Sequence, residues 1–538
     1  MKKKLLVTCS LVVLTITAMA GHASRVSLAK GYVFEDLNDN GKRDRGERGI
    51  AGVGVCNGRG TIVQTDEKGY YEVPVGNDNI VFVIKPAGYA LPLDKDNMPI
   101  YYYVYKPQGT PDANWRFKGC PPTGKLPSSI DFALRPSDEP TEFKALIFGD
   151  PQVRTEIMLD FFDKKIVNDV GDGSDYAFGI GMGDVSDEDL NLMGRYREIT
   201  GRIGTPWYNV VGNHDSNYDA MSDSLSTETF VAHFGPADYS FNYANAHVLA
   251  LDNLLYPDPR NPMRKSPWAG FRQDQRDFIE NDLKLVPKDK LVIVAAHVPF
   301  IDNWVRTSDI RFLFMQLGRF ENVLLLTAHL HTTQHIYYGE KQGWFGRQPL
   351  HEINVGATCG SWYSGFLDEK GFPEARMTDG TPQGYVILDV KNQSYSVDYK
   401  TAGKPIDYQM IIHHPKVVMQ DRHTPSYIVV NYFMGYKDDR VEFRLDDGEW
   451  KLMKHTLRTD PTYAYMFHKW ELSEAAHPNR WPSHPSVSKH IWQARIPVYG
   501  VPVGKHRIEI RATDRFGNVH RGESWYRIEP VNNPNQYP

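Results

Sequence analysis

Five apolar runs in the middle of this 538-residue chain each end in side chains that can bind a metal ion. The runs are "FKALIFGD", "YAFGIGMGD", "PWYNVVGNHD", "KLVIVAAH" and "ENVLLLTAHLH". Short continuous apolar runs of this kind predict buried strands. Because ligands bind at the carboxyl ends of the strands in open α/β sheets, we expect these polar residues to lie close together.

The residue types at the strand ends suit a pair of divalent cations. Imidazole suits Zn, Fe, Ni and Cu, whereas carboxylate and amide oxygens suit harder ions such as Mn and Mg. A carboxylate can bridge two metals, and a metal pair can clamp a substrate oxygen and lower the pKa of a bound water. A single strand-end His predicts little, but five such strand ends in this order predict a dimetal site.

The motifs at these five strand ends carry a family resemblance. "GDPQ", "GMGDVSDE", "VGNHD", "AAH" and "AHLH" resemble the five sequence blocks of the calcineurin-like metallophosphoesterases, over residues 143–400. The G-N-H-D block is the most specific of them. The resemblance implies an α/β fold, a four-layer α/β/β/α sandwich, with a dimetal site that hydrolyses phosphate esters.

The resemblance also implies a role for each polar residue. Seven side chains would bind the metals: Asp150, Gln152, Asp184 and His331 for the first, and Asp184, Asn213, His297 and His329 for the second. Asp184 would therefore bridge the two ions. His214 would bind neither ion and would protonate the leaving oxygen, and Asp187 would orient that His.

Two positions depart from the commoner family pattern. Gln152 replaces the His of D-x-H, and Ala328 replaces the Gly of G-H-x-H. Gln can still bind a metal through its amide oxygen, and a branch that resembles ADP-ribose and CDP-alcohol pyrophosphatases carries the same D-x-Q. An oxygen ligand favours Mn or Mg over Zn at the first metal site, and among Mn, Fe, Zn and Mg our preferred ion is Mn. The alternative is a decayed site, in a binding protein whose β-domains recognise a glycan or another protein.

The segments on either side of the central one have a different sequence pattern. Residues 24–136 and 405–530 contain short alternating runs between turns, which predict two small β-sandwich domains around a central domain at 143–402. The polar stretch "RPSDEPTE" marks the first linker.

The N-terminal segment also contains a calcium-like motif. "DLNDNGKRDRGE" matches D-x-[DN]-x-[DN]-G-x5-E, with oxygen donors at Asp36, Asn38, Asn40, Lys42 (through its carbonyl), Asp44 and Glu47. A structural Ca²⁺ is one interpretation. A plain polar hairpin is the other.

A Gly-rich loop, "GATCGSWYSG", follows the last metal-binding motif. It resembles the loop that faces the metals in related enzymes, and there Trp362 and Tyr363 could stack on a base or a sugar. Ordinary loop packing is an equal alternative for both aromatics.

The N-terminus predicts export. A basic start, an apolar stretch and an A-x-A site predict a signal peptide at residues 1–20 and a periplasmic or secreted protein.

In an oxidising compartment Cys56 and Cys120 could form a disulfide, which the sequence leaves open. No later run is apolar enough to span a membrane. The net charge of -5 does not suggest a nucleic-acid partner. We expect a phosphorylated small molecule, nucleotide or glycan as substrate.

Overall fold

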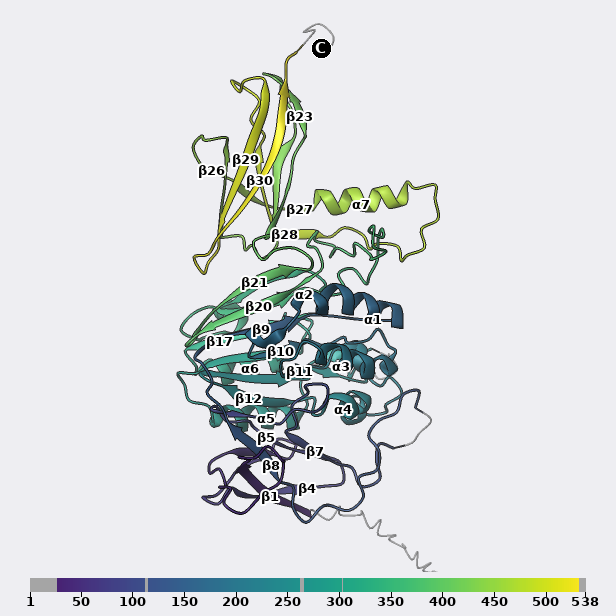
Figure 1. The fold of residues 1–538 in the computed structure, drawn as a ribbon, viewed down its shortest axis with the longest axis vertical. Helices are drawn as coiled ribbons and strands as arrows, with labels where there is room; N and C mark the ends of the chain where they lie inside the picture. The colour runs from purple at the N-terminus through teal and green to yellow at the C-terminus, as the bar shows by residue number, and fades with distance from the viewer. Residues whose placement is uncertain (1–26, 112–114, 262–265, 302, 532–538) are drawn as a thin grey trace, which may run out of the picture.

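A computed structural model describes residues 27–111, 115–261, 266–301 and 303–531. The predicted signal peptide, residues 1–20, lies outside the described residues. Figure 1 shows an elongated molecule with N-terminal strands at one end, a central α/β domain, and C-terminal strands at the other end.

The N-terminal segment forms two four-stranded sheets. The first has the order β4-β1-β8-β6: β4 (Tyr70–Val75), β1 (Ser27–Glu35), β8 (Phe132–Pro136) and β6 (Tyr89–Ala90). The second has the order β3-β2-β5-β7: β3 (Ile62–Gln64), β2 (Gly54–Cys56), β5 (Asn79–Val83) and β7 (Tyr102–Tyr105). The strands β1 and β4 alternate between buried and less buried residues, as expected where only one face of a sheet is covered.

The central domain is built on two mixed sheets. The first has the order β11-β10-β9-β20-β21: β11 (Trp207–Asn209), β10 (Phe178–Gly181), β9 (Glu142–Phe148), β20 (Gly384–Lys391) and β21 (Ser394–Thr401). The second has the order β12-β13-β16-β17-β19-β18: β12 (Tyr239–Tyr243), β13 (Ala246–Leu251), β16 (Leu291–Ala296), β17 (Asn322–Thr327), β19 (Leu350–Val355) and β18 (Thr333–Tyr338). A small ribbon pairs β14 (Leu254–Leu255) with β15 (Trp268–Ala269).

The two central sheets pack against each other through aromatic side chains. Phe241 of β12 stacks on Tyr208 of β11 with ring centroids 4.1 Å apart, and it meets Phe178 of β10 at 5.2 Å. The strands β13 and β16 run parallel and are buried along their whole length. Such burial requires cover on both faces of the sheet, so helices must lie outside the strands.

Helices supply that cover. They are α1 (Glu156–Phe162), α2 (Asn168–Val170), α3 (Met193–Gly201), α4 (Glu228–Phe234), α5 (Gln273–Lys284) and α6 (Thr307–Leu317). Shorter helical turns are η1 (Asp163–Val167), η2 (Gly173–Asp175), η3 (Leu190–Leu192), η4 (Asn213–Asp215), η5 (Asp223–Leu225) and η6 (Glu340–Gln342). Phe162 of α1 packs on Phe148 of the first sheet, and Phe314 of α6 packs on Tyr338 of the second. The architecture is therefore the expected layered α/β sandwich.

The C-terminal segment contains a four-stranded and a five-stranded sheet. Its strands are β22 (Met410–His413), β23 (Val417–Met419), β24 (Tyr427–Tyr432), β25 (Arg440–Leu445), β26 (Lys451–Leu452), β27 (Lys454–Thr459), β28 (Val487–Arg495), β29 (Gly504–Thr513) and β30 (Val519–Glu529). It also contains a helix that the sequence analysis missed, α7 (Pro461–Glu471), which projects sideways from the strands in Figure 1. Asp460 caps this helix by accepting a hydrogen bond from the Tyr463 amide at 2.8 Å.

The N-terminal sheets share one hydrophobic core with the central domain, whereas the C-terminal sheets have a core of their own. Phe82 of β5 packs edge-on against Phe278 of α5, with centroids 5.7 Å apart. Beside this contact, Lys106 forms an ion pair with Glu228 at 2.5 Å, with side chains only 5% and 3% exposed. The N-terminal segment is thus fixed to the central domain by packing and by buried charge.

The possible disulfide between Cys56 and Cys120 is not present, because both residues are free, buried thiols. Burial raises the pKa of each thiol to about 12. Among the described residues, no helix is both long enough and apolar enough to cross a membrane.

Candidate metal centre

The polar strand ends of both central sheets meet at one place. Asp150 and Gln152 follow β9, Asp184 follows β10, and Asn213 begins η4 after β11. The three histidines come from the second sheet: His297 follows β16, and His329 and His331 follow β17. The centre therefore lies at the carboxyl ends of parallel strands.

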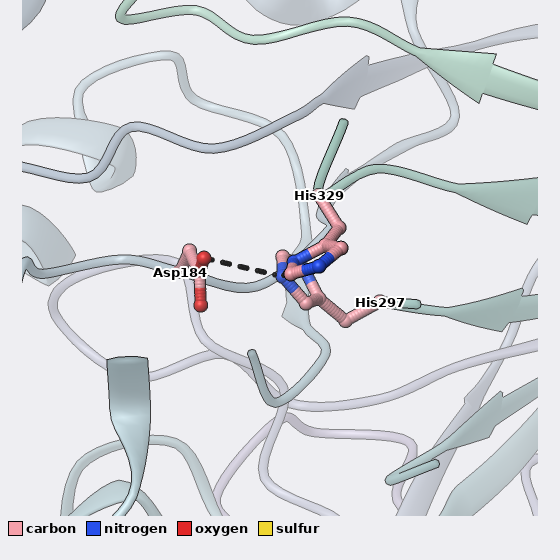
Figure 2. A group of neighbouring side chains, drawn as sticks. All are labelled: Asp184, His297 and His329. Atoms are coloured by element: carbon pink, nitrogen blue, oxygen red, sulfur yellow. Dashed lines mark hydrogen bonds and ion pairs between the residues drawn. The ribbon is translucent and has the colours of Figure 1, made fainter. Parts of the chain in front are cut away.

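Three of these residues form a compact group of donor atoms. Figure 2 shows Asp184, His297 and His329 pointing toward one another. Their donor atoms all lie within 4.8 Å of each other, as required of residues that share an ion. The Oδ2 of Asp184 is 3.2 Å from Nε2 of His297, which in turn is 3.2 Å from Nδ1 of His329.

Asp150 and His331 extend this group. The Nε2 of His331 is 3.6 Å from Oδ1 of Asp150, and the same carboxylate oxygen is 3.9 Å from Nε2 of His297. The backbone amide of His329 donates to Asp150 as well, at 3.0 Å. Asp150 thus holds the histidine loop that follows β17 against the loop that follows β9.

The protein fixes which imidazole nitrogen each buried histidine offers. Nδ1 of His297 lies 2.8 Å from the carbonyl oxygen of Met182, and Nδ1 of His331 lies 2.8 Å from that of Gly360. A carbonyl accepts only from a protonated nitrogen, so Nε2 of each ring is left for a metal. Such partners are typical of metal-binding histidines.

Two amide oxygens at the centre have no hydrogen-bond partner. Both Oε1 of Gln152 and Oδ1 of Asn213 are buried and unsatisfied. A buried polar atom without a partner costs about 1–3 kcal/mol. A cation bound by these oxygens would remove that cost, so the residues present fit a metal site, including the unusual Gln.

The backbone at the centre is held in an uncommon conformation. Positive φ values occur at Asp150 (32°), Gln152 (35°), Asp184 (50°), His329 (71°) and His331 (50°). Residues other than Gly uncommonly adopt this left-handed region, and those that do cluster at functional sites. The strain therefore marks the five residues as positioned for their side chains.

The charges at the centre shift the pKa values of its residues. Burial lowers the pKa of His297, but the charge of Asp184 outweighs this and raises it to about 9. Burial, together with the charge of His297, lowers the pKa of His329 to about 4. Although burial opposes it, the charge of His297 holds the pKa of Asp184 well below its usual range. A metal that binds here must displace the proton of His297.

Asp215, the last residue of G-N-H-D, was given no role by the sequence analysis. Its buried carboxylate accepts from the amides of Gly212 and Val185, both at 2.9 Å. It therefore ties the Asn213 loop to the Asp184 loop. Gly212 permits this approach, since a Cβ at that position would lie 2.0 Å from the Asp184 amide nitrogen.

His214 lies beside the centre and is only partly buried. Its backbone amide donates to Oδ1 of Asp184 at 2.8 Å, and its Nδ1 lies 3.3 Å from Oδ1 of Asp187. The latter contact lies within ion-pair distance but is not aligned as a hydrogen bond. Asp187 also accepts from Nε of Arg154 at 2.6 Å, a partner that the sequence analysis missed.

The two aromatics of the Gly-rich loop have different surroundings. Trp362 is partly exposed and stacks on His331, with ring centroids 4.3 Å apart and planes at 25°. Tyr363 is 1% exposed, and its hydroxyl donates to the carbonyl oxygen of Pro151 at 2.9 Å. For Tyr363 this burial favours the loop-packing alternative over stacking on a substrate.

Oxygen donors of the calcium-like loop accept hydrogen bonds from within the loop. The Asp36 carboxylate accepts from the amides of Asn40 and Gly41, and the Glu47 carboxylate from those of Leu37 and Asp44. The side-chain amides of Asn38 and Asn40 donate to Asp44, which lowers the pKa of that carboxyl. The Lys42 amide donates to Asn40. Calcium binding by these residues stays a prediction.

Two protein families match the segments on either side of the metal-binding residues. Residues 37–120 match the family described as "N terminal of Calcineurin-like phosphoesterase". Residues 352–520 match the family described as "C terminal of Calcineurin-like phosphoesterase". No curated protein matches the sequence.

Solved structures give weaker similarities. Purple acid phosphatase PPD1 from yellow lupin (Lupinus luteus) seeds is 15% identical over 65% of this chain and 67% of its own, with a TM-score of 0.36. The 5'-nucleotidase from Candida albicans SC5314 is 13% identical over 48% of this chain and 51% of its own, with a TM-score of 0.27. At these scores neither similarity adds to the assignment.

The matched segments enclose a layered α/β domain in which acidic, amide and imidazole donors converge at the strand ends. The chain is therefore a calcineurin-like phosphoesterase, a metal-dependent phosphoester hydrolase.

Proposed function

We propose that this protein is an exported dimetal phosphoesterase that hydrolyses a phosphomonoester, phosphodiester or pyrophosphate bond. The observation that carries the proposal is the pair of buried, unsatisfied amide oxygens, Oε1 of Gln152 and Oδ1 of Asn213. They lie among acidic and imidazole donors, so the site is built for cations and not for packing. A decayed site would be expected to have lost some of these donors.

The first ion would be held by Asp150, Gln152, Asp184 and His331, and the second by Asp184, Asn213, His297 and His329. Two bound divalent ions supply charge for the phosphoryl oxygens and lower the pKa of a water. Because Gln152 contributes an oxygen, Mn²⁺ is the preferred ion, and Fe, Zn and Mg are the alternatives.

His214 is placed to move a proton and not to bind a metal. Its ring is partly exposed beside the donor group, while its backbone is fixed by Asp184. Asp187 faces Nδ1, so Nε2 is left for the leaving oxygen. Arg154 holds Asp187 in place through its guanidinium.

Export is supported by the sequence alone, through the basic start, the apolar stretch and the A-x-A site of residues 1–20. The mature protein would then work in the periplasm or outside the cell. Its substrate would be a phosphorylated small molecule, a nucleotide or a glycan.

The test is an activity screen of the full mature chain with Mn²⁺. The substrates are 4-nitrophenyl phosphate, bis(4-nitrophenyl) phosphate and a nucleoside diphosphate. We expect turnover of at least one substrate, abolished by chelation and restored by Mn²⁺. Asp187→Asn should retain the metals but lose part of the rate. No metal-dependent turnover of any phosphate ester would overturn the proposal.

A further inference from the structure

A loop of the C-terminal domain lies against the Gly-rich loop of the metal centre. It connects α7 with β28 and spans residues 472–486. The amide of Gly365 donates to the carbonyl oxygen of Arg480 at 3.1 Å. The side chain of Asn479 donates to the carbonyl oxygens of Tyr363 and Gly365, both at 2.9 Å. The backbone of Arg480 is therefore fixed next to Trp362, independently of its own side chain.

Aromatic packing behind the loop strengthens this attachment. Phe366 meets Trp470 of α7 at 5.0 Å and His477 at 4.9 Å. The helix α7 and the loop after it thus form one packed unit on the central domain. The C-terminal domain therefore packs on the Gly-rich loop beside the metal centre.

The guanidinium of Arg480 lies over the Trp362 ring, 5.3 Å from its centroid. His331, a predicted metal ligand, stacks on the same indole. Arg480 therefore contacts the same indole as a predicted metal ligand, which places it beside the metal centre.

The charge of Arg480 is not neutralised by a neighbour. In the part of the chain that the structure describes, Arg154 pairs with Asp187, whereas no carboxylate pairs with Arg480. Partial burial and the nearby Arg154 lower the pKa of Arg480, and the charge of Asp187, which is already paired with Arg154, opposes them. An exposed cation with a fixed backbone, no ion-pair partner among the described residues and a second cation nearby can receive an anion from outside the chain.

We propose that Arg480 binds a second anionic group of the substrate, next to the phosphoryl group that reacts at the metals. The substrate would then carry two adjacent phosphates, as a nucleoside diphosphate or a diphosphate ester does. The inference rests on the proposed function for the position of the reacting phosphoryl group. A guanidinium suits this task because it can donate two parallel hydrogen bonds to one phosphate.

The first test is direct binding by calorimetry to Mn²⁺-loaded full-length protein. The probes are methylenediphosphonate, which carries two adjacent phosphonates and resists hydrolysis, and methylphosphonate, which carries one. We expect the wild type to bind the diphosphonate more tightly. Arg480→Ala should weaken diphosphonate binding by about 10- to 100-fold and methylphosphonate binding by much less.

Two further variants test whether binding depends on the charge of Arg480, on its paired donors, or on neither. Arg480→Lys keeps the charge but loses the paired donors, so it should recover only part of the affinity. Arg495→Ala is the matched control, because Arg495 also lies over an aromatic ring, that of Tyr427, and donates to the Pro425 carbonyl oxygen. It should bind both probes like the wild type.

The outcomes distinguish this inference from the proposed function. Equal weakening of both probes in Arg480→Ala, or equal affinity of the wild type for both, overturns the inference even if the enzyme turns over esters. If no ester is turned over but the diphosphonate binds through Arg480, the second-phosphate site stands and the proposed reaction fails.

Discussion

His214 differs from the other histidines of the centre in the partners of its ring. His297 and His331 each have Nδ1 on a backbone carbonyl and Nε2 facing a carboxylate of the donor group. His214 instead faces Asp187 and Glu188, which lie outside that group. From this difference in partners we expect His214 to transfer a proton and the other two histidines to bind metal.

His214→Ala should lower kcat by about 10²- to 10⁴-fold while the metal content stays at the wild-type value. The loss should be smaller for a nitrophenyl ester than for an alkyl ester, because nitrophenolate leaves with little protonation. His297→Ala is the comparison and should lose metal. Kinetics on both esters and elemental analysis test this. Metal loss in His214→Ala, or equal impairment on both esters, would contradict the assigned role.

Glu352 gives a pH dependence that is separate from the metal centre. It is fully buried on β19 and accepts from the hydroxyls of Thr327 and Tyr338, at 2.8 and 2.6 Å. Burial raises its pKa from the usual 4.5 to about 7. Between these two pH values the unfolded chain loses the proton and the folded chain keeps it. Stability therefore falls as pH rises through this window, by up to about 3 kcal/mol.

Glu352→Gln removes this titration and keeps an acceptor oxygen for one of the two hydroxyls, which donate to different oxygens of Glu352. The melting temperature of the variant, relative to the wild type, should therefore rise between pH 5 and pH 8. Because every other group titrates in both proteins, the difference isolates Glu352. Thermal scans at several pH values measure it, and a difference that does not change with pH would refute the raised pKa.

At the scale of elements, the contact between the end of β7 and the start of α4 depends on a buried ion pair. Lys106 follows β7 and pairs with Glu228, the first residue of α4. Lys106 also contacts Asp78, and Thr110 donates to Glu228. A buried ion pair adds little over an apolar pair, but a buried charge that has lost its partner is strongly destabilising.

Lys106→Met should destabilise the protein by about 3–5 kcal/mol, because it leaves Glu228 buried with its main partner removed. Lys437→Met is the control, since Lys437 pairs with Asp438 on an exposed surface, and it should have no measurable effect. Thermal unfolding of both variants provides the measurement. Similar melting temperatures for the two would show that the contact does not depend on this pair.

At the scale of the whole molecule, the two hydrophobic cores predict how the chain unfolds. One core runs through the N-terminal sheets and the central domain, and the other belongs to the C-terminal sheets. Calorimetry should therefore show two transitions. Phe82→Ala should lower the midpoint temperature of the transition that includes the metal centre. Ile510→Ala, in the C-terminal core, should lower the midpoint temperature of the other transition. A single transition lowered equally by both variants would contradict this division.

The central fold and its strand-end residues could be predicted because apolar runs that end in metal-binding side chains are visible locally. The attachment of Arg480 to the Gly-rich loop could not, because it joins segments more than a hundred residues apart. The helix α7 was hidden among strand-like runs by its aromatic residues. The adjacent Trp362 and Tyr363 follow no periodic pattern, so only the packing decides which of them is buried.

The most direct test of the dimetal centre is the metal content of the full mature chain after Mn²⁺ loading and gel filtration. We predict about two ions per wild-type chain, as expected for two sites with a shared carboxylate. Asp184→Asn should fall below one ion per chain and lose turnover, because this residue serves both sites. A wild-type chain without bound transition metal, or an Asp184→Asn variant with unchanged metal content, would contradict the account.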